Sequence, residues 1–359
     1  MKLGIAGAGL LGRLLALRLS RLGHTIDVFD PAAGPDARGA AGWTAAGMLS
    51  PTAELESADM NVFDYGVRSI DLWADLLPTL ARPVAFSRAG SLLLAHRPDT
   101  GAAQRMIRLL DDKAPAEHRP QAISIAELAR LEPDVHGPSQ AWLLPHEGQL
   151  HTVQAMQALY ASADDGKVTW HWNTTVTRLT AGTLHDGETG RQFDHVFDVR
   201  GTGARDEGAT EAGPAISCRQ VRGVRGEIFW VHAPGVRLNR PVRLLHPRHR
   251  VYLVPRPGDI VVIGASEIES EDRSPVSLRS TVELLAAAHS VMPALAEARL
   301  VHNETNLRPA LADNLPRIEH ETGLTRINGL FRHGWLIAPA IVEEALTTLN
   351  FRHPRTRPT

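Results

Sequence analysis

The chain has 359 residues, of which 43% are hydrophobic, and its formal net charge at pH 7 is −2. This length suffices for two domains, and the near-neutral charge excludes a global field that would recruit nucleic acid or an acidic membrane. The single cysteine, Cys218, excludes an intrachain disulfide and a cysteine-rich metal site. We therefore expect a cytoplasmic protein without a metal.

The sequence lacks the motifs of several other functional classes. No apolar run approaches the roughly 18 residues of a membrane span, and Arg13 interrupts the apolar start too early for a secretory signal. Neither a P-loop motif nor a G-x-S-x-G motif occurs. Lysines occur only at positions 2, 113 and 167, so any lysine-based chemistry depends on these three. We expect no membrane partner and no nucleic-acid partner.

The first thirty residues predict a nucleotide-binding unit. An apolar strand over 2–6 is followed by the glycine motif Gly7-Ala8-Gly9-Leu10-Leu11-Gly12, a helix over 10–21, and a second strand over 25–29 that ends in Asp30. This order of strand, G-x-G-x-x-G turn, helix, strand and acid is typical of dinucleotide sites. The pattern itself does not distinguish FAD from NAD.

Each glycine of the motif has its own structural role. Gly7 allows the tight turn, Gly9 lets the backbone approach a pyrophosphate, and Gly12 lets the helix pack closely on the strand. The helix N-terminus offers free N–H groups to the phosphates. Asp30 is placed to accept hydrogen bonds from an adenosine ribose.

The remaining pattern mixes helices and strands. A nearly uncharged run of small residues over 42–51 predicts close packing against a flat group, with a buried helix start as the alternative. Helical periodicity occurs over 59–80, 101–112, 124–132, 152–161, 277–296 and 338–350. Strand-like segments occur over 86–96, 168–179, 194–203, 226–231, 242–245, 251–255, 260–264 and 326–331.

Several segments, in order along the chain, resemble the D-amino-acid oxidase family of FAD flavoproteins, and within it the glycine oxidases of thiamine biosynthesis. The matching segments are GAGLLG with Asp30, AAGMLSP at 45–51, RGVRGE at 222–227, RPVRLLHP at 240–247, YLVPR at 252–256, VVIGASEIESED at 261–272, LRPALADNLPRI at 307–318 and LFRHGWLIAPA at 330–340. The part from 222 to 340 is the most specific.

This resemblance implies an α/β fold of two interleaved domains. A Rossmann-like FAD-binding domain would comprise residues 1–82, 148–216 and 303–359. A substrate-binding domain with a mostly antiparallel β-sheet would comprise 83–147 and 217–302. The flavin ring would lie at their boundary, and the chain could form a homo-oligomer, as members of the family often do.

The resemblance also implies residue roles. Arg308 would bind the substrate carboxylate, Tyr252 would donate its hydroxyl to the same group, and Arg332 would line the site near the flavin. The turn from Gly334 to Ala340 would present a helix N-terminus to the flavin ring. The implied FAD contacts are Gly7, Ala8, Gly9, Leu10, Leu11, Gly12, Asp30, Trp43, Thr44, Ala45, Ala46, Gly47, Met48, Val176, Gly201, Gly203, Arg308, His333, Gly334, Trp335, Leu336 and Ile337.

The implied reaction is FAD-dependent oxidation of glycine or a related small amino acid to its imine, with dioxygen as acceptor and hydrogen peroxide as product. The imine would hydrolyse to a 2-oxo acid and ammonia or enter thiazole assembly. Sarcosine, another secondary amine or a D-amino acid remains an alternative substrate. An NAD-dependent dehydrogenase and a flavin-binding protein without oxidase activity are the rivals from other classes.

A few residues depart from the family pattern. Arg250 would select a substrate with a second acidic group if it faced the pocket, although a solvent-facing side chain is favoured. Trp43 is bulky beside the flavin segment, and His151 stands where an aspartate is frequent. His246 and His249 have no neighbouring carboxylate or cysteine, so a structural role is favoured over metal binding.

Overall fold

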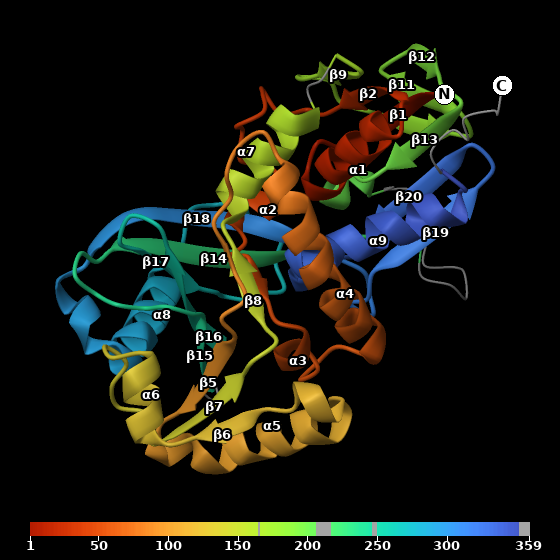
Figure 1. Cartoon of the computed structure of the whole chain (residues 1–359). Coiled ribbons are helices and arrows are strands. Elements are labelled where there is room, and N and C mark those ends of the chain that lie inside the picture. Colours follow the sequence, from red (N-terminus) through yellow and green to blue (C-terminus); the bar gives the residue numbers. More distant parts are fainter. Residues whose placement is uncertain (164–165, 206–216, 246–249, 352–359) are drawn as a thin grey trace.

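The computed structural model describes residues 1–163, 166–205, 217–245 and 250–351, with the side chain of Arg250 left out. Two main sheets dominate this part of the chain, and the chain passes between them several times (Figure 1). The chain therefore has the mixed α/β class that its sequence pattern predicts.

The first main sheet has six strands in the order β19-β20-β13-β1-β2-β9. Its inner strands are parallel, and only β19 at one edge runs antiparallel. The strands are β1 (Lys2–Ala6), β2 (Thr25–Phe29), β9 (Val168–His171), β13 (His195–Asp198), β19 (Arg317–Glu321) and β20 (Leu324–Asn328). The main helices packed with this sheet are α1 (Leu10–Arg21), α4 (Met60–Leu76), α7 (Thr152–Ala163) and α9 (Gly334–Thr348).

The nucleotide-binding unit is confirmed with the predicted bounds of β1, α1 and β2. A Cβ atom at Gly12 would lie 1.9 Å from the Gly7 carbonyl oxygen, so α1 can approach β1 this closely only with glycine there. Gly7 itself has a φ of +105°, which a side chain would strain. The motif therefore sets both the turn and the helix packing.

The second main sheet has eight strands in the order β18-β14-β17-β16-β15-β5-β7-β6. All neighbours are antiparallel except β15 and β5. The strands are β5 (Ser91–Ala95), β6 (Gln121–Ile123), β7 (Gln140–Leu144), β14 (Arg222–His232), β15 (Val242–Leu245), β16 (Arg250–Arg256), β17 (Ile260–Gly264) and β18 (Arg299–Ala310). Helix α8 (Leu278–Val291) packs its apolar face on this sheet, and α5 (Thr100–Lys113) and α6 (Ile125–Leu131) lie near β5 to β7 (Figure 1).

Smaller elements complete the described fold. One three-stranded sheet joins β3 (Met48–Leu49), β8 (Gly148–Leu150) and β4 (Phe86–Ser87), and another joins β10 (Arg178–Thr180), β11 (Thr183–Asp186) and β12 (Thr189–Gln192). The short helices are α2 (Ala41–Thr44) and α3 (Pro51–Glu54). The 3₁₀ helices are Leu77–Thr79, Arg97–Asp99, Ala116–His118, Gly201–Ala204, Pro293–Glu297 and Phe331–His333.

Several predicted elements need correction. The single strand predicted over 168–179 is wrong, because β9 ends at His171 and Asn173 takes a positive φ of 54°. The segment 86–96 holds two strands rather than one, and Gly90 turns the chain between them. The last helix begins at Gly334, four residues before the predicted start. Strands β18 and β19 were not predicted at all.

The domain bounds remain a prediction. The predicted boundary at residue 303 falls inside β18, which pairs with β14 along its length. The eight-stranded sheet therefore continues seven residues past this boundary, as far as Ala310.

Candidate active site

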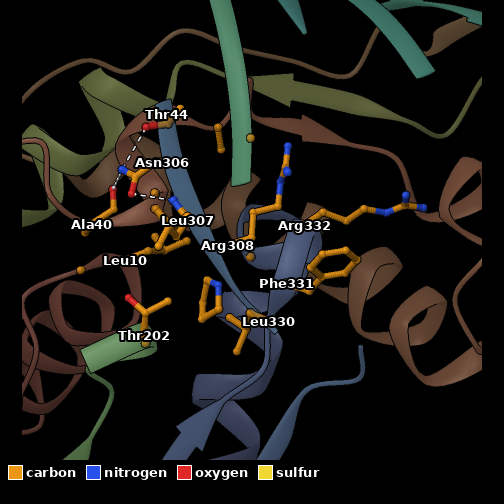
Figure 2. Close-up of a pocket in the computed structure, with 18 of the residues that line it drawn as sticks. Leu10, Ala40, Thr44, Thr202, Asn306, Leu307, Arg308, Leu330, Phe331 and Arg332 are labelled. Atoms are coloured by element: carbon orange, nitrogen blue, oxygen red, sulfur yellow. Dashed lines mark hydrogen bonds between the residues drawn. The ribbon is translucent and has the colours of Figure 1, made fainter. Parts of the chain in front are cut away.

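A cavity of about 590 Å³ is lined by residues from both main sheets. Its walls are the glycine motif, the segment 39–48, the loops after β9 and β13, strands β14, β15, β16 and β18, and the start of α9. Figure 2 shows a close-up of side chains that line it. Parts of the chain that are distant in sequence therefore share one cavity.

One end of the cavity is formed by the nucleotide-binding unit. The predicted contacts Gly7, Gly9, Leu10, Leu11, Asp30, Val176, Gly201 and Gly203 all line it. Gly9 precedes α1, and no side chain caps this helix, so its first N–H groups have no side-chain partner. An uncapped helix N-terminus beside a glycine turn suits a diphosphate.

Asp30 holds the loops at the nucleotide end of the cavity through hydrogen bonds to backbone N–H groups. Its Oδ2 accepts the Ala8 N–H at 2.6 Å, and its Oδ1 accepts the Ala32 N–H at 2.8 Å. A carboxylate has about four acceptor positions, so the predicted contact with ribose hydroxyls remains open to it. Arg200, which sequence analysis missed, also lines the cavity, and its guanidinium binds Asp198 and the Val176 carbonyl.

The middle of the cavity is lined by residues 44–48, whose main chain is held by hydrogen bonds. The Thr152 hydroxyl donates to the Ala45 carbonyl at 2.9 Å, and the buried Arg256 guanidinium donates to the Ala46 carbonyl. Gly47 has a φ of +70°, and a Cβ atom there would lie 2.2 Å from the Leu150 oxygen. This rigid segment of small residues offers a surface on which a flat ring could pack.

Arg308 extends from β18 into the polar end of the cavity. Its Nη1 donates to the Arg225 carbonyl at 3.3 Å, and its Nη2 donates to the Ser266 carbonyl at 3.0 Å. Each terminal nitrogen carries two N–H groups, so each keeps one donor for a ligand. Within the described part of the chain, no carboxylate forms an ion pair with Arg308.

The surroundings of Arg308 make it a desolvated cation. Burial lowers the pKa of the guanidinium, while the neighbouring Tyr252 and Glu267 oppose that shift. Arginine nonetheless stays protonated in proteins. A partly buried positive charge of this kind is stabilised by an anion that binds beside it.

Tyr252 lies in β16 opposite Gly264 of β17 and opposite Arg243 of β15. A Cβ atom at Gly264 would lie 2.7 Å from the tyrosine oxygen, so the ring occupies the space that the glycine leaves. Burial raises the pKa of Tyr252, although Arg308 and Arg243 oppose the shift. The phenol therefore stays protonated near neutral pH and can donate a hydrogen bond into the cavity.

Arg332 differs from Arg308 because it forms ion pairs with acidic side chains. Its Nε lies 2.8 Å from Glu54, its Nη1 lies 3.4 Å from Glu267, and its Nη2 lies 2.5 Å from the Ser57 hydroxyl. Figure 2 shows the side chains of Arg308 and Arg332 diverging from neighbouring elements. Arg332 lines the cavity as predicted, but acidic partners already compensate its charge.

Glu54 is the acidic centre of this end of the cavity. It accepts from Arg332 and from Arg243 at 3.0 Å, and His333 Nδ1 lies 3.2 Å away. Burial favours the neutral acid, but the two guanidinium groups outweigh it and hold the pKa of Glu54 well below its usual range. Sequence analysis missed Glu54 and Arg243 as site residues, although Arg243 lies within the segment 240–247 and Glu54 lies three residues after the segment 45–51.

Six predicted FAD contacts do not line the cavity: Ala8, Gly12, Trp43, His333, Leu336 and Ile337. Trp43 is buried in the core, where the Arg13 guanidinium lies 5.2 Å from its ring centroid. The predicted contacts Gly334 and Trp335 do line it, at the N-terminus of α9. Contact between the six residues and a cofactor stays a prediction.

The remaining predictions concern metal binding, membrane-spanning helices and three residues between 246 and 250. Among the described residues, no group of three histidine, cysteine, aspartate or glutamate side chains is placed to hold a metal ion. Within the same ranges, no helix has both the length and the apolar character needed to cross a bilayer. His246, His249 and the Arg250 side chain lie outside the described residues, so the prediction for each stays open.

Comparisons with known proteins agree with this geometry. The sequence profile of the FAD dependent oxidoreductases (DAO) matches residues 2–345. A Rhizobium etli protein named as the thiamine biosynthesis oxidoreductase ThiO is 37% identical over 350 residues, which cover 97% of this chain and 96% of the relative. A glycine oxidase of Geobacillus kaustophilus is 26% identical over 359 residues, covering 93% of this chain and 89% of the relative.

A solved structure shows the same fold. The crystal structure of a Bacillus cereus glycine oxidase matches with a TM-score of 0.84 at 20% identity, over 99% of this chain and 98% of that one. The cavity fits FAD, because it joins an uncapped helix N-terminus, a glycine turn and a flat segment in one space. Because the family profile matches residues 2–345 and a relative is 37% identical over nearly the whole chain, the chain belongs to the DAO family of FAD-dependent oxidoreductases.

Proposed function

We propose that this enzyme oxidises glycine, or a closely related small amino acid or amine, to its imine as a step that serves thiazole formation in thiamine biosynthesis. The imine would then hydrolyse to a 2-oxo acid and ammonia. The names of the Rhizobium etli and Geobacillus kaustophilus relatives support the substrate class and the biosynthetic role. Dioxygen as the electron acceptor is part of this proposal.

One observation carries the substrate assignment: Arg308 is a partly buried cation that has two free donors and no ion-paired carboxylate within the described residues. A guanidinium fork matches a carboxylate in two parallel hydrogen bonds. Tyr252 lines the same cavity and can donate to the same carboxylate. An α-amino acid held in this way has its Cα fixed at one place in the site.

The residues present would hold FAD along the cavity. The glycine motif and the start of α1 would hold the diphosphate, Asp30 and Val176 would face the adenosine, and residues 44–48 would pack along the flavin ring. Bound there, FAD would supply a two-electron acceptor for the hydride from the amine carbon, and dioxygen would take up these electrons as hydrogen peroxide. The positive end of α9 would favour negative charge on the ring system.

The side chains around the substrate would act by orientation and desolvation. Arg308 and Tyr252 hold the carboxylate, and the buried setting strengthens these charge-assisted hydrogen bonds. Glu54 is ionised and paired with Arg332 and Arg243, so we assign it to holding those arginines in place. The substrate amine must be neutral when it is oxidised, and this scheme uses no side-chain base.

The substitution Arg308→Lys tests the assignment. Lysine keeps the charge but loses the fork and both carbonyl contacts, so we expect binding of glycine to weaken about 100-fold while bound flavin is retained. Steady-state kinetics and the visible flavin spectrum measure the two properties separately. Arg237→Lys is the matched control, because Arg237 is 67% exposed and pairs with Asp134 at the surface. An Arg308→Lys enzyme with unchanged affinity for glycine would show that the carboxylate binds elsewhere.

A further inference from the structure

We propose that Ser266, held by the buried carboxylate of Glu227, is a positioning residue that fixes the Arg308 guanidinium for the substrate carboxylate. The inference rests on the proposed function, in which Arg308 binds that carboxylate. It adds a second layer of residues, none of which the sequence predicted as part of the site.

The first step is the contact between Arg308 and the loop after β17. The Ser266 carbonyl accepts from Arg308 Nη2 at 3.0 Å, and Ser266 also lines the cavity. The Arg225 carbonyl accepts from Nη1 at 3.3 Å. Gly226, between Arg225 and Glu227 on β14, leaves room for the guanidinium. The direction of the fork therefore depends on where these two carbonyls lie.

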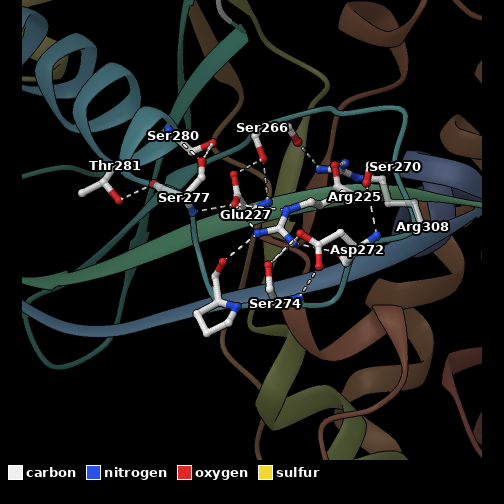
Figure 3. Close-up of polar contacts among 11 residues, drawn as sticks. Arg225, Glu227, Ser266, Ser270, Asp272, Ser274, Ser277, Ser280, Thr281 and Arg308 are labelled. Carbon is white, nitrogen blue, oxygen red and sulfur yellow. Dashed lines mark hydrogen bonds and ion pairs between the residues drawn. The ribbon is translucent and has the colours of Figure 1, made fainter.

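In the second step, hydrogen bonds to Glu227 fix the position of Ser266. The Ser266 hydroxyl donates to the Glu227 carboxylate at 2.9 Å and accepts from the Glu227 N–H at 3.0 Å (Figure 3). The Ser266 N–H donates in turn to the Glu227 carbonyl at 3.3 Å. Three hydrogen bonds thus join these two residues, and two of them need the serine hydroxyl.

The third step is that Glu227 is itself fixed. Its side chain is fully buried and forms an ion pair with Arg225, whose Nη2 lies 2.6 Å away. The same carboxylate accepts the Ser277 N–H at the start of α8, at 2.8 Å. Burial opposes ionisation, but the hydrogen bonds from Ser280, Arg225 and the Ser277 N–H lower the pKa of Glu227. The carboxylate is therefore a charged, fully satisfied anchor.

Arg225 also forms hydrogen bonds with other residues of the loop after β17. Its Nη1 donates to the Asp272 carbonyl and its Nη2 donates to the Pro275 carbonyl, each at 2.8 Å. The side chain of Arg225 thus holds the loop after β17, while its own carbonyl is one of the two that hold Arg308 (Figure 3). One buried ion pair consequently fixes both acceptors of the substrate-binding arginine.

The test measures binding of glycolate, a carboxylate of the size of glycine without an oxidisable amine, to the flavin-loaded enzyme. Ser266→Ala removes both hydroxyl hydrogen bonds, so we expect glycolate to bind about tenfold more weakly, as judged by the change in flavin absorbance. The KM for glycine is expected to rise by a similar factor, with kcat far less affected. Ser266→Thr keeps the hydroxyl and is expected to restore binding.

Ser274→Ala is the matched control. The Ser274 hydroxyl donates to Asp272 at 2.6 Å and accepts from Arg225 Nη1 at 3.4 Å, but it forms no hydrogen bond with Ser266 or Arg308, so its loss leaves the Ser266–Glu227 pair intact. This variant is expected to bind glycolate as the unmodified enzyme does. If Ser266→Ala does not retain flavin, Glu227→Gln takes its place in the same comparison, because it weakens the same anchor while keeping the side-chain size.

A double variant separates positioning from general damage. In the Arg308→Lys background, Ser266→Ala is expected to have little further effect, because the residue through which it acts is gone. Equal losses in both backgrounds, or wild-type affinity in Ser266→Ala, would overturn the positioning role alone. Wild-type affinity for glycolate in Arg308→Lys would overturn the proposed function together with this inference.

Discussion

At the scale of single residues, a glycine decides where Arg308, the proposed substrate-binding arginine, can lie. A Cβ atom at Gly226 would be 2.5 Å from Cζ of Arg308 and about as close to both terminal nitrogens. We predict that Gly226→Ala displaces the guanidinium and weakens glycine binding about tenfold, while flavin stays bound, because one or two hydrogen bonds to a charged group are lost. The KM for glycine and the flavin content of the purified variant measure these effects.

Gly101→Ala is the control for this substitution. Gly101 lies in α5, and an added Cβ atom would have its nearest neighbour at 3.8 Å, so this change should leave the KM unaltered and stabilise the helix slightly. If Gly226→Ala bound glycine normally, the fit between β14 and Arg308 would have no part in substrate binding.

Single residues also show how far the sequence could predict the site. Arg308 and Tyr252 were named through a resemblance, and both line the cavity. Glu54, Arg243 and Ser266 were missed because an isolated acid, arginine or serine has no spacing that marks it. Their importance arises from cross-strand and loop contacts that only the folded chain creates.

At the scale of elements, two buried glutamates are associated with the short helix α3, and their pKa values are shifted in opposite directions. Glu54 belongs to α3, and its two arginine partners lower its pKa. Glu147 accepts the Ala53 N–H of the same helix at 2.9 Å, and burial raises its pKa. The position of α3 against the cavity should therefore depend on pH in two distinct ways.

The pH dependence of stability tests this arrangement. A lowered folded-state pKa means that ionised Glu54 stabilises the fold above the unfolded-state pKa of about 4.5, an effect lost as the pH falls through the folded-state value. Near pH 7, Glu54→Gln should cost about 3 kcal/mol and lower Tm by roughly 5 °C. This difference should shrink below about pH 4.5.

For Glu147→Gln, the stability difference from the wild type should depend on pH in the opposite direction. A raised folded-state pKa means that protonated Glu147 stabilises the fold at low pH, and this contribution is lost as the pH rises through the folded-state value. Thermal unfolding of the wild type and both variants between pH 2 and pH 8 measures these differences. Parallel Tm profiles for the three proteins would contradict the assigned shifts.

Elements also differed in how well the sequence predicted them. The unit β1, α1 and β2 was predicted to the residue, because regular apolar periods are bounded there by glycines. Strand β18 was missed because it lies at a sheet edge, where the partly exposed His302 and the exposed Asn303 break the apolar alternation. Its Pro309 also argues against a strand, although an edge strand tolerates proline.

At the scale of the whole molecule, function depends on a cavity that neither sheet forms alone. The six-stranded sheet and the segments around it supply the nucleotide end, and the eight-stranded sheet supplies Arg308 and Tyr252. Local periodicity could predict the class of many segments but not which distant segments meet. The interleaved arrangement was expected only because the matching motifs lie in both halves of the chain.

The most direct test of the account is an anaerobic absorbance titration of the purified, flavin-loaded protein with glycine. If Arg308 and Tyr252 place a small amino acid for oxidation, the visible flavin bands will bleach as glycine is added and will return when air is admitted. Flavin bands that remain unchanged with glycine, sarcosine and D-alanine would contradict the proposed activity, while leaving membership of the FAD-dependent family intact.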